Sequence, residues 1–100
     1  MVQMNIPDRM KVKINFDDTS LSEAARTLQP LIFQKANYFC CLLGPDPQVG
    51  VFGCGETVSK ALIDWEANIH KRIISYKEGD EVAEFIITRL NIANNGLEKQ

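Results

Sequence analysis

The chain has 100 residues, of which 45% are hydrophobic and 24% are charged, and its formal net charge is −2. This length allows one compact domain with one core, and the composition excludes disorder of the whole chain. The charge balance gives no general attraction to nucleic acid or to an anionic membrane. The chain also lacks the run of ~18 apolar residues that a membrane span requires.

The two ends of the chain are predicted to be irregular. Residues 1–10 are predicted to be a flexible lead-in, because Pro7 and Asp8 disfavour regular structure. This segment has no basic start followed by an apolar block, so no secretory signal is predicted and we expect a cytoplasmic protein. We expect a single domain over residues 11–93 and a frayed tail over residues 94–100.

The first predicted strand is Lys11–Phe16, where apolar and polar residues alternate. Such alternation is typical of a strand with one buried face. A short helix follows. We expect Ser20 to cap it, with Glu23 completing a capping box, and Pro30 to end it near Leu28.

Two further strands are predicted as a hairpin. Leu31–Phe33 is a first extended piece, and Tyr38–Leu43 is an uninterrupted apolar run typical of a central strand. The prolines of Gly44–Gln48 indicate a turn. Val49–Gly53 is then expected to return as the partner strand.

The strongest helical pattern in the chain is predicted over Thr57–Ile74, with Thr57 as the N-cap and Trp65 as a central core residue. Its apolar stripe has spacings of three and four, and comprises Val58, Ala61, Leu62, Trp65, Ile69 and Ile73. The segment Glu81–Leu90 has helical spacing after a possible cap at Asp80, but its β-branched residues also suit a strand. We favour a helix.

These elements predict an α+β fold. A small antiparallel sheet of three or four strands would carry the long helix across one face, with one or two shorter helices beside it.

Two glycines before the long helix raise the question of a phosphate-binding loop. Gly53 and Gly55 have the spacing of the first two glycines of a dinucleotide fingerprint, but the third position holds Val58. The lysine of a nucleotide-binding loop is also absent. The negative charge of Glu56 would repel a phosphate at the start of the helix. We therefore interpret both glycines, with Thr57, as a structural turn and cap.

The cysteines do not form a pattern that suggests chemistry. Cys40 and Cys41 are adjacent and point to opposite faces of a strand, so they are poorly placed to share a metal. Cys54 and His70 are too far apart along the predicted helix for a catalytic dyad. We expect reduced, buried thiols, no metal, no cofactor and no enzymatic activity.

The segment GCGETVSKAL, Gly53–Leu62, resembles the turn into the helix of HicB-like antitoxin domains and related phage and bacterial proteins. The preceding YFCCLLGPDPQVGVFG is similar to the hairpin of that family, so the resemblance covers about Tyr38–Arg72. It implies a non-catalytic, partner-binding domain with a partial RNase-H-like or double-stranded-RNA-binding-like shape. The DNA-binding domain that HicB antitoxins usually append has no counterpart after residue 77, so control of a toxin operon is not implied.

Three functions are consistent with these observations. The leading hypothesis is a protein that binds another protein in a HicB-like manner; a homodimer through an exposed sheet edge is a further option. The alternatives are a nucleic-acid-binding module and a phage-type inhibitor of a host complex. The candidate partner-facing residues are Lys60, Lys71 and Arg72 for the basic patch, and Glu78, Asp80 and Glu81 for the acidic stretch.

Overall fold

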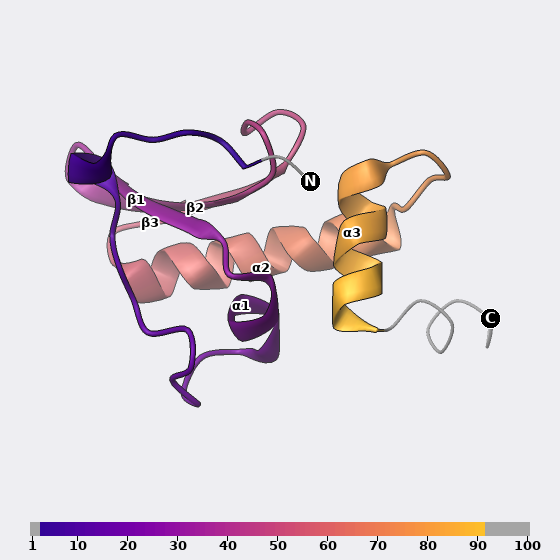
Figure 1. The fold of residues 1–100 in the computed structure, drawn as a ribbon, viewed down its shortest axis with the longest axis horizontal. Coiled ribbons are helices and arrows are strands. Elements are labelled where there is room, and N and C mark those ends of the chain that lie inside the picture. The colour runs from indigo at the N-terminus through magenta and orange to yellow at the C-terminus, as the bar shows by residue number, and fades with distance from the viewer. Residues whose placement is uncertain (1–2, 92–100) are drawn as a thin grey trace.

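The computed structural model of the chain describes residues 3–91. It contains a three-stranded antiparallel sheet with one long helix across a face, which confirms the predicted α+β fold (Figure 1). The elements in chain order are η1 (Asp8–Met10), α1 (Glu23–Leu28), β1 (Leu31–Lys35), β2 (Tyr38–Leu43), β3 (Val51–Gly55), α2 (Val58–Ile74) and α3 (Glu81–Leu90).

The sheet has the order β1-β2-β3, so the apolar strand β2 is central, as predicted. The hairpin between β2 and β3 is also confirmed, but β3 begins at Val51 and not at Val49. The Asp46 side chain accepts hydrogen bonds from the backbone N–H groups of Gln48 and Val49, both at 2.8 Å. These contacts keep both residues in the turn.

The predicted strand Lys11–Phe16 is not formed. Lys11 makes an isolated bridge to Phe33, and the N–H of Val12 donates to the carbonyl of Ile32 at 2.8 Å. The expected alternation of half-buried and exposed residues is present. The chain nevertheless passes around the β1 edge here, from one face of the sheet to the other, and pairing ends after one contact (Figure 1).

Each face of the sheet has its own apolar cluster. Trp65 of α2 is fully buried against one face, as predicted, together with residues of α1 and α3. The N-terminal segment covers the other face through Ile6, which packs with Phe33, Cys40 and Leu42.

Helix α1 begins later than predicted. Its N-cap is Ser22, whose Oγ accepts from the N–H of Ala25 at 3.1 Å. Ser20 instead belongs to the preceding turn, where its N–H donates to Asp18 at 2.9 Å. The helix ends at Leu28, as Pro30 predicts.

Both later helices start at capping side chains. The Oγ1 of Thr57 accepts from the N–H of Lys60 at 3.1 Å, and the Oδ1 of Asp80 accepts from that of Ala83 at 3.0 Å. The segment Glu81–Leu90 is thus a helix, as favoured. Among the described residues, none of the helices combines the length and the apolar character of a membrane span. The predicted tail, 94–100, lies outside the described residues.

Candidate functional site

The two glycines of the GCG segment lie inside β3, not in a turn. A Cβ placed on Gly53 would lie 2.3 Å from the backbone N of Trp65, and one on Gly55 would lie 2.6 Å from that of Ala61. Neither glycine has a positive φ. The interpretation of these glycines as a turn is therefore wrong: they are small because α2 packs directly on the strand.

The outer edge of β3 is covered by three polar side chains of α2, spaced four residues apart. The N–H of Cys54 donates to Asp64 Oδ2 at 3.0 Å. The amide of Asn68 donates to the carbonyl of Phe52 at 2.7 Å. Arg72 donates to the carbonyl of Gly50 at 3.2 Å. These contacts satisfy three backbone groups along or next to this edge, so an added strand would have to displace the side chains of α2.

Two of the predicted partner-facing residues bind each other. Arg72 donates two hydrogen bonds to Asp80, from Nε at 2.7 Å and from Nη2 at 3.0 Å, and about a quarter of each side chain is exposed. The hydrogen bonds from Arg72 are the main cause that lowers the pKa of Asp80. This pair joins the end of α2 to the cap of α3.

The structure does not gather the other predicted partner-facing residues. Lys60 lies in the first turn of α2 and forms an exposed ion pair with Glu56 at 3.3 Å. Lys71 is exposed in the last turns of the same helix, and Glu78 and Glu81 are exposed around the start of α3. Lys60 thus lies at the start of α2, whereas Lys71 and Arg72 lie at its end, so the three cations do not form one patch.

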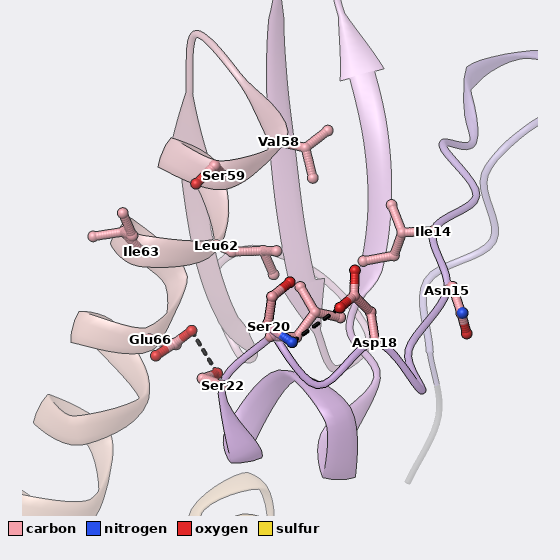
Figure 2. Close-up of a pocket in the computed structure, with 11 residues that line it drawn as sticks. Ile14, Asn15, Asp18, Ser20, Ser22, Val58, Ser59, Leu62, Ile63 and Glu66 are labelled. Atoms are coloured by element: carbon pink, nitrogen blue, oxygen red, sulfur yellow. Dashed lines mark hydrogen bonds between the residues drawn. The ribbon is translucent and has the colours of Figure 1, made fainter.

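A groove of about 590 Å³ lies between α2 and the segment that leads into α1. Val58 and Leu62 of the helix face Ile14 across it, while Ile63 lies at its outer edge (Figure 2). The groove has no signal in the sequence pattern, because it joins segments about 40 residues apart.

A second hollow of about 370 Å³ shares Ser22 and Glu66 with the groove. Ser22 Oγ donates to Glu66 Oε2 at 2.6 Å (Figure 2). Because both residues line both hollows, this hydrogen bond lies between them. The second hollow is also lined by His70 and Ile74 of α2. We call the groove, the second hollow and the exposed isoleucines Ile63 and Ile74 the groove face.

The charged side chains of the groove face are mainly acidic. Asp18 and Glu66 line the groove, and Glu23 and Glu66 line the second hollow beside His70. The N–H of Ser20, followed by its side chain, lowers the pKa of Asp18 and favours the charged carboxylate.

The cysteines do not form a metal site or a dyad with His70. Among residues 3–91, no three His, Cys, Asp or Glu side chains are grouped so that they could hold a metal ion. Cys54 packs with the cluster on the sheet face opposite α2, whereas His70 is exposed on α2. Cys40 and Cys41 are buried as predicted, but Cys54 is only half-buried, which corrects the expectation for that thiol.

Comparison of the chain with family models, with curated proteins and with solved structures gives no match. The similarity to HicB-like domains therefore stays a prediction.

Proposed function

We propose that this chain is a non-catalytic module that binds a protein partner through the groove face. The observation that carries the proposal is the exposure of two isoleucines on one face of α2 beside an apolar groove. Ile63 is 65% exposed and Ile74 is 85% exposed.

The two isoleucines lie on the same side of the helix. They are eleven residues apart, which is about three helical turns and roughly 16 Å along the axis. Single exposed apolar residues are common on protein surfaces and need no explanation. Here, however, Ile63 borders the groove and Ile74 borders the second hollow, so each exposed isoleucine continues an apolar lining.

The charges of the groove face indicate the chemistry of the partner. Asp18, Glu23 and Glu66 border the apolar surface. A complementary partner carries an apolar segment flanked by Lys or Arg side chains. The same acidic groups repel a nucleic-acid backbone, which disfavours this surface for nucleic acid.

The proposed mode of binding is a helix or extended segment lying in the groove, and not a strand added to the sheet. Asp64, Asn68 and Arg72 already occupy the outer edge of β3. A HicB-like manner of binding is part of this proposal. Its support is the hairpin followed by a helix that packs on Gly53 and Gly55.

The alternative functions have less support from the positions of their residues. For the basic patch, Arg72 is held by Asp80, and Lys60 pairs with Glu56. For the acidic stretch, Asp80 is the residue that holds Arg72. Nucleic-acid binding and inhibition by the acidic stretch are therefore treated as alternative outcomes of the test.

Site-specific photo-cross-linking in the source cell tests the proposal. A photoreactive amino acid replaces Ile63 in one variant and Val49 in a matched control, since Val49 is an apolar residue, 50% exposed, in the turn between β2 and β3. We expect a discrete protein adduct from position 63 and none from position 49. Val49 lines a hollow with Asp80 and Glu81, so an adduct from position 49 alone would favour binding through the acidic stretch and contradict the proposal. Equal adducts from both positions, adducts with nucleic acid, or adducts with a second copy alone would also contradict it.

A further inference from the structure

The cysteines Cys40 and Cys54 face each other across the central hairpin. They are directly opposite in the register of β2 and β3, and their sulfur atoms lie 2.6 Å apart. Both side chains belong to the cluster on the sheet face away from α2. The structure holds them as free thiols.

The backbone places this pair at a position that a disulfide can bridge. Directly opposite residues of an antiparallel ladder alternate between hydrogen-bonded and non-hydrogen-bonded pairs. The N–H of Cys54 donates to Asp64 and not to β2, so Cys40 and Cys54 form a non-hydrogen-bonded pair. The Cα atoms of such pairs are typically about 4.5 Å apart, within the range of about 4.4 to 6.8 Å that disulfides span.

The two thiols differ in access. Cys40 is fully buried, whereas Cys54 is half-buried. Burial, followed by the hydrogen bond to Cys54, raises the pKa of Cys40 to about 12. Cys54 is therefore the thiol that meets an external reagent first, and its conversion to a mixed disulfide removes the hydrogen bond that holds the Cys40 proton.

Cys41 does not compete for this reaction. It follows Cys40 directly, so it points to the opposite face of β2, where it is fully buried under α2. Burial raises its pKa to about 12.

We propose that Cys40 and Cys54 form a reactive thiol pair that small-molecule disulfides of the glutathione class oxidise to a cross-strand disulfide. In the first step, the Cys54 thiolate attacks the small disulfide and releases one small thiol, leaving a mixed disulfide on Cys54. In the second step, Cys40 attacks the Cys54 sulfur, loses its proton and releases the second small thiol. Two protein thiols and one small disulfide thus give one protein disulfide and two small thiols.

Oxidised glutathione is the probe for the test, with the folded full-length chain and intact-protein mass spectrometry. The wild type is expected to lose the mass of two hydrogen atoms. Cleavage before Asp46 separates Cys40 and Cys41 from Cys54, so the two fragments stay joined until dithiothreitol is added. The disulfide is also expected to raise the melting temperature reversibly by about 10 °C or more.

Three variants assign the bond. Cys41→Ala is expected to behave like the wild type. Cys40→Ala retains a single glutathione on Cys54, because no second thiol can displace it, and Cys54→Ala takes up none. A wild type that keeps three thiols, one that stops at the glutathione adduct, or a disulfide that survives Cys40→Ala would overturn the proposal.

Discussion

Helix α2 packs directly on β3 at Gly53, and Gly53→Ala tests this contact directly. The added methyl group would lie 2.3 Å from the backbone N of Trp65, 2.5 Å from its Cα and 2.9 Å from the carbonyl carbon of Asp64. All three atoms belong to the helix backbone, so rotation of a side chain cannot relieve the overlap. The helix must therefore retreat from the strand by about 1 Å before the contact becomes ordinary.

The energetic cost follows from what this retreat disturbs. Overpacking of a core costs typically about 1–3 kcal/mol. The retreat also lengthens the hydrogen bonds from α2 to the edge of β3, each of which contributes about 1 kcal/mol. We expect a loss of at least about 3 kcal/mol, which lowers the melting temperature of a domain of this size by about 12 °C or more.

Urea unfolding followed by the fluorescence of Trp65, the single tryptophan, measures this cost. The matched control is Gly79→Ala. A Cβ there meets no atom within 4 Å, but φ is +94°, so the cost comes from backbone conformation alone and amounts to about 1 kcal/mol. The reasoning is refuted if Gly53→Ala costs no more than Gly79→Ala.

Two further predictions concern the caps of the helices. Asp80→Asn keeps an N-cap but removes the charge opposite Arg72, and should cost about 1–2 kcal/mol in urea unfolding at neutral pH. Because the pKa of Asp80 is lowered on folding, its contribution is present above the ordinary value of 3.8 and is lost as the pH falls through the lowered pKa. The stability difference between wild type and Asp80→Asn should therefore shrink on acidification, and a constant difference would contradict this cause. Thr57→Ala should cost about 1 kcal/mol and Thr57→Ser much less; equal losses in thermal unfolding would exclude a capping role.

The sequence patterns that predicted correctly are those that extend over a whole strand or helix. The uninterrupted apolar run of β2 and the helical stripe of α2 were recognised, because each is long and strongly periodic. The boundaries of β3 and α1 were missed, because single side-chain contacts from Asp46 and Ser22 decide them. The strand predicted at Lys11–Phe16 does not form, because the chain crosses from one face of the sheet to the other there and pairs with β1 only at Lys11.

The groove face could be predicted only in part. Its isoleucines are visible in the sequence, but the groove exists because a segment before α1 packs beside α2. The role of Gly53 likewise appears only when the helix is placed on the strand. One local signal could have been used: Asp64, Asn68 and Arg72 recur every four residues, which places them on one side of α2.

The central claim is that the groove face binds a protein partner, and the dissociation constant of the complex tests it most directly. The partner captured from position 63 is purified and titrated against the wild type, Ile63→Asp and Val49→Asp. Both replaced side chains are exposed, so both variants should fold. We predict that Ile63→Asp weakens binding by about tenfold or more, as expected for an apolar contact in an interface beside acidic groups, while Val49→Asp stays within about twofold of the wild type. Equal dissociation constants for the two variants would contradict the claim.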